Sequence, residues 1–384
     1  MFDSLLKFSG RKKKKRSSSS SDSSLTFARL ERRDLRASFY VDAISGDDAN
    51  PGTADQPFAT YLPVVWAYDQ ADGANIGTVQ LQPGDELVFR GGTYSATFQN
   101  PSDRNTGIHR GLYLRGLNGT AENPIVVRAE PGAVINPSPA DGSEHFSVQI
   151  DQSEHVVFSG FEITGLGTGV FVSESSDIEI TNNWIHDIDG AAIDNLSGVM
   201  LTANDGLIEV HGNLFNDIYD RGNGASENSR AFVAFGNEGA DVRVFNNTLF
   251  NSVPIDSGFG SGGIVTKHGS DSSFSVHHNV FYQVRDEAIG TSNPNSTIDH
   301  NLILSSDGVS VRDLGGPAFF NDILIEQNTF VKADHALKYN PTDVWYGAID
   351  AYDDIGELSF LNNLVEHTGL LAVSYTHLTL PTKA

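Results

Sequence analysis

The chain of 384 residues contains no cysteine. A disulfide framework and a thiolate metal site are therefore excluded. The chain also has no apolar run that approaches the ~20 residues of a membrane-spanning helix, so we expect no membrane span. Basic residues are scarce beyond position 38: the last 346 residues hold 14 Lys or Arg against 45 Asp or Glu, a net charge of −31. This acidity argues against nucleic acid as a partner of the main body.

What the sequence does contain is one short pattern, repeated: apolar, any, apolar, any, any, Asn, any, apolar. The asparagines of the seven copies are Asn183, Asn213, Asn247, Asn279, Asn301, Asn328 and Asn363. Ser296 is the one exception at the apolar positions, and an eighth copy carries Phe161 in place of Asn. The spacing between copies varies from 22 to 35 residues while the pattern itself is constant. A fixed pattern with variable spacers is typical of a solenoid.

The pattern predicts a short strand, a tight bend and a second strand. When coils are stacked at the strand spacing of about 4.8 Å, each Asn amide can donate to one neighbour and accept from the other, as an Asn ladder. Asn also tolerates the left-handed backbone that a sharp bend requires. A third strand follows, which begins with a small residue, as in segments 263–267 and 308–312. We therefore expect three short strands per coil and assign the repeated asparagines a structural role.

Three segments near the start carry a family resemblance: 39–42 (Phe-Tyr-Val-Asp), 46–53 (Gly-Asp-Asp-Ala-Asn-Pro-Gly-Thr) and 56–60 (Gln-Pro-Phe-Ala-Thr). Together with segments 83–94 and 123–132, they resemble the opening of bacterial right-handed β-helix proteins, a group that includes many polysaccharide lyases, of the pectate and alginate lyase kind.

The resemblance implies an all-β chain, folded as a right-handed, single-stranded parallel β-helix over residues 39–372. It also implies a capping helix over about residues 61–72, where Pro63 would lie near the helix start and be tolerated. The acidic segment 42–48 has two interpretations: a structural turn, or a calcium loop that lacks the full twelve-residue pattern.

The two ends of the chain differ from the body. Residues 1–38 combine a basic run at 11–16 with a Ser tract at 17–21, and segment 27–35 resembles the leader of large exported proteins of planctomycete bacteria. We expect a disordered or targeting leader, with a solvated basic tail or nucleic-acid affinity as the alternative, and an extracellular or cell-surface location. Residues 373–384 fit no coil and resemble translated sequencing-adapter read-through, which we interpret as a non-native tail of a longer natural protein.

The candidate chemistry lies in the third strands. Lys267 and Arg312 occupy equivalent positions two coils apart, with Ser292 between them, and Lys338 points outward one coil further on. Two coil spacings separate their backbones by about 9–10 Å, so long side chains can converge on one sugar unit. This arrangement suits β-elimination of a uronic acid polymer, in which a Lys of lowered pKa is the base and an Arg neutralises the carboxylate.

We therefore assign catalysis to Lys267, Arg312 and His268, and substrate binding to Lys338, Arg285, Trp345 and Tyr346. The resemblance to lyases implies a calcium ion, for which the candidate ligands are Asp187, Asp189, Asp217, Asp220 and Asp256, because hard oxygen ligands suit calcium. Solvated acidic loops are the alternative interpretation of these residues. We expect a monomer that acts on an acidic polysaccharide.

The sequence departs from one lyase pattern. β-Helix lyases of alginate and chondroitin place an Arg about one coil after the Lys, and segment 288–292 has none.

Two other functions stay open, a glycoside hydrolase and a non-catalytic glycan-binding protein. β-Helix polygalacturonases use clustered Asp residues with a His-Gly element; here His268-Gly269 precedes Asp353-Asp354, which is the wrong order. A non-catalytic surface adhesin or glycan-binding protein would instead use exposed aromatic residues to stack on sugar rings.

Overall fold

The computed structural model describes residues 36–64, 68–69, 74–75, 79–95, 98–99, 109–137, 145–189, 197–219, 231–236, 239–252, 262–267, 273–284, 287–291, 293–312, 322–340, 358–366 and 372–373. The chain divides into two units, Met1–Leu35 and Arg36–Ala384, and all described residues belong to the second. Most of the expected leader and nearly all of the expected tail therefore lie outside the described residues.

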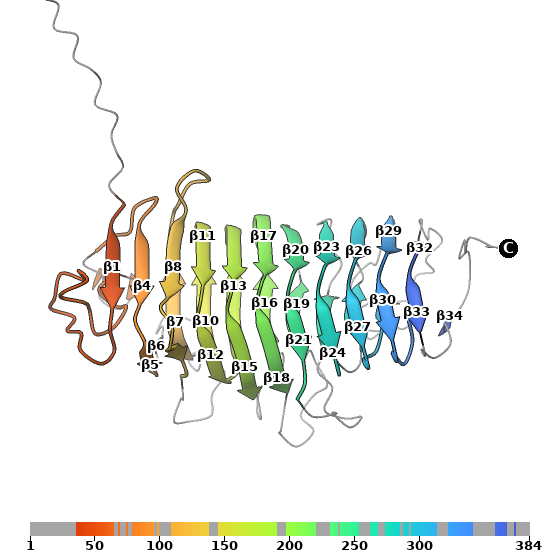
Figure 1. Cartoon of the computed structure of the whole chain (residues 1–384). Coiled ribbons are helices and arrows are strands. Elements are labelled where there is room, and N and C mark those ends of the chain that lie inside the picture. The colour runs from red at the N-terminus through yellow and green to blue at the C-terminus, as the bar shows by residue number, and fades with distance from the viewer. Residues whose placement is uncertain are drawn as a thin grey trace, which may run out of the picture. The chain divides into compact units, whose positions relative to one another are not determined.

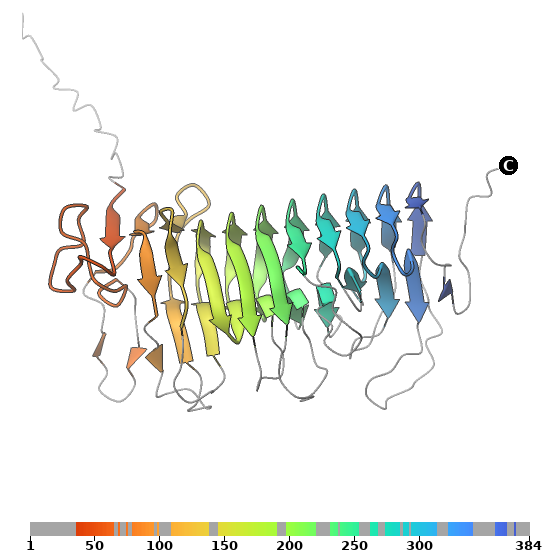
Figure 2. The same cartoon turned by 60° about the horizontal axis from the view of Figure 1, so that its bottom comes forward.

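The second unit is a right-handed parallel β-helix built from three long sheets (Figures 1 and 2). Successive coils add one strand to each sheet, so that neighbouring strands in a sheet come from neighbouring coils. Each coil passes through the sheets in the same order, and we number the sheets by that order, starting from the strand that precedes the repeated Asn. The class and the three-strand coil that the sequence predicts are confirmed.

Sheet 1 holds the strand before each Asn. Its strands are β1 (Ser38–Val41), β4 (Glu86–Phe89), β8 (Ile125–Ala129), β11 (Glu154–Ser159), β14 (Ser176–Thr181), β17 (Asp205–His211), β20 (Asp241–Phe245), β23 (Phe274–His277), β26 (Ser296–Asp299), β29 (Ile323–Glu326) and β32 (Leu358–Leu361). All neighbouring pairs in it are parallel.

Sheet 2 holds the strand after the bend. Its strands are β5 (Gly92–Tyr94), β9 (Ala133–Ile135), β12 (Glu162–Leu166), β15 (Trp184–Asp189), β18 (Leu214–Tyr219), β21 (Thr248–Phe250), β24 (Val280–Tyr282), β27 (Leu302–Leu304), β30 (Thr329–Val331) and β33 (Leu364–Glu366). Most of these strands have only three residues, because the coil turns again soon after the bend.

Sheet 3 holds the third strand of each coil and, at its edge, the two-residue strand β6, which pairs antiparallel with β7 of the same coil. Its strands are β6 (Phe98–Gln99), β7 (His109–Arg115), β10 (His145–Asp151), β13 (Thr168–Ser173), β16 (Ser197–Thr202), β19 (Ala231–Gly236), β22 (Gly262–Lys267), β25 (Ile289–Thr291), β28 (Val309–Arg312), β31 (Leu337–Asn340) and β34 (Ala372–Val373). The small residue that begins these strands has a steric reason. A Cβ on Gly263 or Gly308 would lie 2.0 Å from a backbone carbonyl oxygen of the next coil.

The core is the column of apolar side chains that the three sheets enclose. The apolar positions of the repeated pattern supply much of it, for example Ile180, Val210 and Val244, which are fully buried on adjacent strands. Ser296, the exception in the pattern, is also fully buried, and its Oγ donates to the carbonyl oxygen of Asn293 at 2.7 Å. A buried hydroxyl is tolerated there because it has this acceptor.

The repeated asparagines form a continuous hydrogen-bond ladder at the bend between sheets 1 and 2. In each step one Asn donates through Nδ2 to Oδ1 of the next at 2.9–3.1 Å. The ladder begins at Asn183, whose Oδ1 accepts the backbone N–H of Phe161 at 3.0 Å. Each bend is thereby joined to the bends on both sides of it.

The left-handed backbone of the bend lies one residue before the ladder, and not on the ladder asparagines as the sequence suggested. The residues at this position have φ between 51° and 82°: Gly160, Asn182, Gly212, Asn246, His278, His300, Gln327 and Asn362. The ladder side chain must point into the bend to reach its neighbours, so the residue before it makes the sharp change of direction.

The prediction of a capping helix is wrong for the described residues within 61–72. Residues 61–64 form a turn, in which the N–H of Val64 donates to the carbonyl of Tyr61 at 3.0 Å. Beyond it, β2 (Tyr68–Asp69) pairs antiparallel with β3 (Ala74–Asn75). Tyr61 and Val64 are both buried in the apolar core. No helix among the described residues is long and apolar enough to cross a bilayer.

The acidic segment near the start forms turns. Oδ1 of Asp42 accepts the N–H groups of Ile44 and Ser45 at 2.9 and 3.0 Å, and Oδ2 accepts the Ser45 hydroxyl at 2.6 Å. Asp48 likewise accepts the N–H and the hydroxyl of Thr60, both at 2.7 Å. These carboxylates are satisfied by protein donors, which favours the turn interpretation of this segment over a calcium loop.

Candidate functional site

The backbone of sheet 3 places Lys267 and Arg312 as the sequence predicts. Lys267 ends β22 and Arg312 ends β28, with β25 between these strands. Val265 lies opposite Gly290, and Gly290 lies opposite Ser310, so Lys267 and Arg312 share one outward column two strands apart. Lys338 lies opposite Ser310, two positions before that column. The structure describes only the backbone of these three basic residues.

Several other predicted residues also lie outside the described part of the chain. They are His268, Arg285, Trp345, Tyr346, Asp220 and Asp256, and for Asp189 only the backbone, at the end of β15, is described. Their roles stay predictions.

Asp187 and Asp217 occupy equivalent positions in β15 and β18, and both have a left-handed backbone. Oδ2 of Asp187 lies 2.7 Å from Nδ1 of His186. Asp217 is buried, and its oxygens accept the N–H and hydroxyl of Ser252 at 2.8 and 3.0 Å and Nδ2 of Asn216 at 2.9 Å. Among the described residues, neither belongs to a group of three ligand atoms close enough to share an ion.

The column of Lys267 extends across sheet 3 toward its N-terminal strands. The sequence analysis did not identify the further residues of this column. Going backward along the sheet it consists of Gly236, Thr202, Ser173, Asp151 and Arg115. These positions alternate with core residues such as Ile150 and Val172, so the column faces outward. The same register rule that places Lys267 was available to find them. We call this outward row, from Arg115 to Arg312, the polar column.

At the N-terminal end of the polar column a compact hydrogen-bond network surrounds Asp151. Its carboxylate accepts the hydroxyl of Tyr113 at 3.0 Å and that of Ser173 at 2.9 Å, and lies 3.4 Å from Nε of Arg115. Asp151, Tyr113 and Ser173 are each less than 10% exposed. Burial, and next the negative charge of Asp151, raise the pKa of Tyr113 above its usual value, so the phenol stays a hydrogen-bond donor. The two hydroxyls thus fix the Asp151 carboxylate, and the partly exposed Arg115 guanidinium is the group of this network that reaches solvent.

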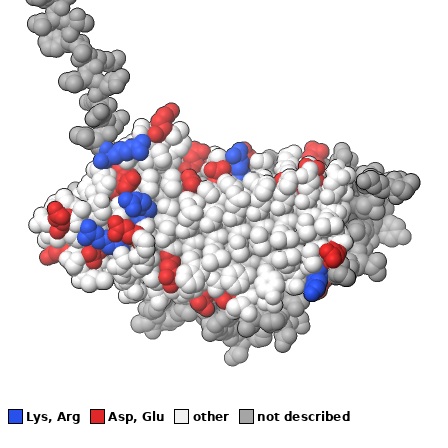
Figure 3. All heavy atoms as spheres, viewed as in Figure 1, with Lys and Arg blue, Asp and Glu red and all other residues white. Residues whose placement is uncertain are grey.

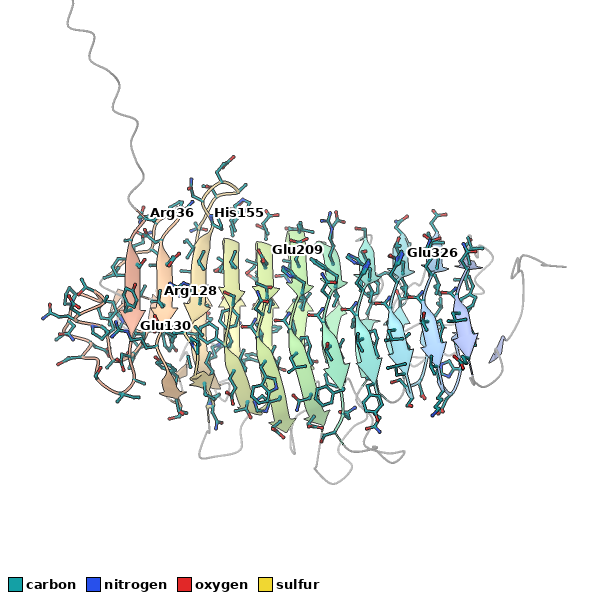
Figure 4. The ribbon with its side chains drawn as sticks, viewed as in Figure 1. Arg36, Arg128, Glu130, His155, Glu209 and Glu326 are labelled. Carbon is teal, nitrogen blue, oxygen red and sulfur yellow. The ribbon has the colours of Figure 1, made fainter. Side chains whose placement is uncertain are left out.

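A second cluster of chemistry-bearing residues lies at the bend between sheets 1 and 2. We call it the histidine corner: His277 and Asp299, which end β23 and β26, and His278 and His300, which follow them. In the same outward column, Glu326 of β29 lies one strand beyond Asp299 (Figure 4). The sequence reasoning treated the bends as structural and did not consider these imidazoles; their recurrence just before a ladder Asn was the available signal.

The geometry of the histidine corner is tight. Nδ1 of His277 lies 3.0 Å from Nδ1 of His278, and Nδ1 of His300 lies 2.6 Å from Oδ2 of Asp299. The rings of His278 and His300 stack with centroids 4.9 Å apart and planes 5° apart. His278, Asp299 and His300 offer ligand atoms that all lie within 4.8 Å of one another. Burial holds the pKa of His277 below its usual value.

A further group with this property is Glu154, His155 and Asp177. Here the His155 ring lies 3.6 Å from Glu154 and 3.8 Å from Asp177. These contacts lie where β11 and β14 begin, at the edge of sheet 1 formed by the N-terminal ends of its strands. His155 is labelled at that edge in Figure 4.

The outer face formed by sheets 1 and 2 is poor in charge over a broad area (Figure 3). Trp184 and Tyr282, both on sheet 2, are 41% and 42% exposed. The Trp184 ring stacks on His186 at 3.9 Å, and its Nε1 donates to Oδ1 of Asn216 at 2.7 Å. The indole is therefore held by the His186 ring and Asn216, while part of it stays exposed to solvent.

The fold and its outward columns define a parallel β-helix protein with polar residues aligned on one face. The family model described as "Periplasmic copper-binding protein (NosD)" matches residues 98–349, more than half of the chain, and the chain belongs to this family. No curated protein matches the chain.

The chain is also similar to solved structures at low identity. A GH136 lacto-N-biosidase from Eubacterium ramulus is 14% identical, with a TM-score of 0.42, over 87% of this chain and 68% of that chain. A mannuronic acid specific family 6 polysaccharide lyase from human gut microbiota is 13% identical, with a TM-score of 0.49, over 79% and 66%. Pectate lyase Pel9A is 15% identical, with a TM-score of 0.36, over 81% and 79%. These likenesses concern the fold alone.

Proposed function

We propose that the chain is an extracytoplasmic, carbohydrate-active β-helix protein that cleaves an acidic polysaccharide by β-elimination along the outer face of sheet 3. The observation that carries the proposal is the register that brings Lys267 and Arg312 into one column, two strands apart. The polar column continues from there through Thr202, Ser173 and Asp151 to Arg115, so the same outward row extends across several coils.

In the proposed reaction Lys267, as the neutral amine, takes the proton α to a uronate carboxylate. The electron pair forms a double bond to the β carbon, and the bond from that carbon to the glycosidic oxygen breaks. The oxygen leaves as a hydroxyl group with a proton from water or from the Lys267 ammonium, which returns Lys267 to the neutral amine. Arg312 would neutralise the carboxylate and stabilise the enolate-like intermediate, as a guanidinium suits a planar carboxylate. Calcium, with Asp187, Asp189, Asp220 and Asp256 as candidate ligands, would supply the same neutralising charge.

The body's net charge of −31 opposes an anionic polymer at long range, so local cations must overcome it. The candidates for this role on sheet 3 are Lys267, Arg312 and Lys338, and Arg115, which is paired with Asp151. A family described as periplasmic is consistent with a substrate outside the cytoplasm.

The test is an assay with pectate, alginate and chondroitin, with and without calcium, that follows the absorbance of the unsaturated product. For any substrate that is cleaved, we expect Lys267→Ala to lower the rate by about 10²–10⁴-fold, the usual contribution of a general base. The matched control is Lys332→Asn, an exposed lysine with a left-handed backbone away from sheet 3, which should keep full activity and the same melting temperature. Full activity in Lys267→Ala would remove that residue from the mechanism, and no product from any acidic glycan would remove the lyase proposal.

A second candidate function is copper binding, which the description of the family names. The observation that favours it is the histidine corner, because imidazole nitrogen with carboxylate oxygen is a donor set that suits copper. Copper would supply Lewis acidity or electron transfer there.

A further inference from the structure

We propose that His278, His300 and Asp299 are the ligands of one first-row transition-metal dication, and that His277 is a positioning residue that orients the His278 ring. The proposal names the site for the second candidate function and rests on it, and it is independent of the lyase chemistry on sheet 3.

The first support is that the fold does not need imidazoles at these positions. His278 and His300 have φ of 57° and 53°, the left-handed position before the ladder Asn. The other coils carry Asn, Gly or Gln there, and Asn and Gly adopt this backbone at the least cost. Two successive coils use a bulkier ring instead, which is the kind of local departure that accompanies a functional site.

The second support is convergence. The two bends are adjacent in the stack, because β23 pairs with β26, and so the two rings stack at 4.9 Å. The ligand atoms of His278, Asp299 and His300 already lie within 4.8 Å of one another. Metal–nitrogen bonds of about 2.0–2.1 Å span ligand atoms up to about 4 Å apart, so small side-chain rotations close the remaining distance.

The third support is the ring of hydrogen bonds behind the ligands. Metal-binding histidines usually engage their other ring nitrogen with a carboxylate or another acceptor, which orients the ring. His300 has this partner in Asp299 at 2.6 Å, and His278 has it in His277 at 3.0 Å. Oδ2 of Asp299 orients His300, and Oδ1 is then the oxygen that it would offer to the ion.

The chemistry of the ligands decides the class of ion. Two imidazoles and one carboxylate suit copper(II) and zinc(II), with copper(II) held more tightly in the general order of stability. Calcium requires six to eight oxygen ligands and is not matched by this set. His278 and His300 are exposed, so the open coordination positions face solvent, and the acidic body concentrates cations near its surface.

The experiment is equilibrium dialysis of the full, untagged chain against copper(II), zinc(II) or calcium, combined with electron paramagnetic resonance of the copper(II) form. We expect one copper(II) per chain with nitrogen couplings from imidazole, weaker zinc(II), and no calcium at this site. The main variant is His278→Asn with His300→Asn, which installs the residue that neighbouring coils already carry, so the fold is preserved. Copper(II) affinity should fall at least a hundredfold and the imidazole couplings should disappear.

Two further variants sharpen the assignment. His211→Asn is the control: His211 lies two strands before His277 in the same column but bonds Glu179 at 3.0 Å, and its loss should leave copper(II) binding unchanged. His277→Ala should weaken binding about tenfold while the copper(II) spectrum keeps both imidazole couplings, as expected of a residue that only orients a ligand.

The outcomes distinguish a wrong assignment of the ligands from the absence of copper binding, the function on which the site rests. If the double variant binds copper(II) with the affinity and spectrum of the wild type, the ion lies elsewhere, for example at Glu154, His155 and Asp177; this site is then wrong while copper binding stands. If the wild type binds no copper(II), both are wrong. Calcium held as tightly as copper(II) would also overturn the assignment.

Discussion

At the scale of single residues, neighbours decide whether a carboxylate holds a turn or is free for chemistry. Asp42, Asp48 and Asp217 each accept two or more N–H or O–H groups from nearby residues, which leaves little capacity for an ion. Asp299 has one hydrogen-bond contact, with His300, and lies close to the His278 imidazole. Residue type alone does not distinguish these cases, because all four residues are Asp.

Asp42 provides a prediction on pH. The hydroxyl of Ser45, and then the N–H groups of Ile44 and Ser45 and the charge of Arg90, lower its pKa in the folded chain against the opposing effect of burial. A lowered folded pKa stabilises the fold above the unfolded pKa of about 3.9, and this contribution is lost as pH falls through the folded value. Wild type should therefore exceed Asp42→Asn in free energy of unfolding at pH 7, and the difference should narrow below about pH 4.

Denaturant unfolding at several pH values measures this difference. Asp55→Asn, at an exposed position in the neighbouring loop, serves as the control. A difference between wild type and Asp42→Asn that stays constant from pH 7 to pH 3 would show that the charge of Asp42 does not contribute.

At the scale of elements, the bend between sheets 1 and 2 is the best predicted part of the molecule. The ladder asparagines stack as expected because the side-chain amide both donates and accepts, so one residue type satisfies the bend on either side. The left-handed residue was assigned one position too late, since Asn suits both roles and both Asn182 and Asn183 are present in the first ladder coil. The capping helix failed because local preference for a helix gave way to burial of Tyr61 and Val64 in the core.

Replacing one ladder residue should destabilise the fold measurably. Asn247 donates through Nδ2 to Val210 O and Asn279 Oδ1, and its Oδ1 accepts two N–H groups of Asn213. Asn247→Ala removes these four bonds at a buried position and should lower the free energy of unfolding by about 2–3 kcal/mol. The adjacent Asn246→Gly is the control, because Asn246 is exposed with φ of 55° and Gly tolerates that backbone. Equal stability of the two variants in denaturant titrations would contradict the role of the ladder.

At the scale of the whole β-helix, stability should depend on position along the stack. Each coil contacts only the coils before and after it, so a central coil has two neighbours and a terminal one fewer. We expect backbone amides of the central strands β14, β17 and β20 to exchange with solvent more slowly than those of β32 and β33. Hydrogen exchange followed by mass spectrometry measures this, and uniform protection of all strands would show that the β-helix opens as a single cooperative unit.

The sequence by itself determined the class of fold, the register of the coils and the column that Lys267 and Arg312 share. The reason is that the repeat is local, since the strands and bend of each coil lie in one continuous segment of the chain. Only the tertiary structure decided which side chains from different coils meet. The hydrogen bonds of Asp151 to Tyr113 and Ser173 span 38 and 22 positions, and the stack of His278 on His300 joins two successive coils. Spacers of variable length carry no record of which neighbours they bring together.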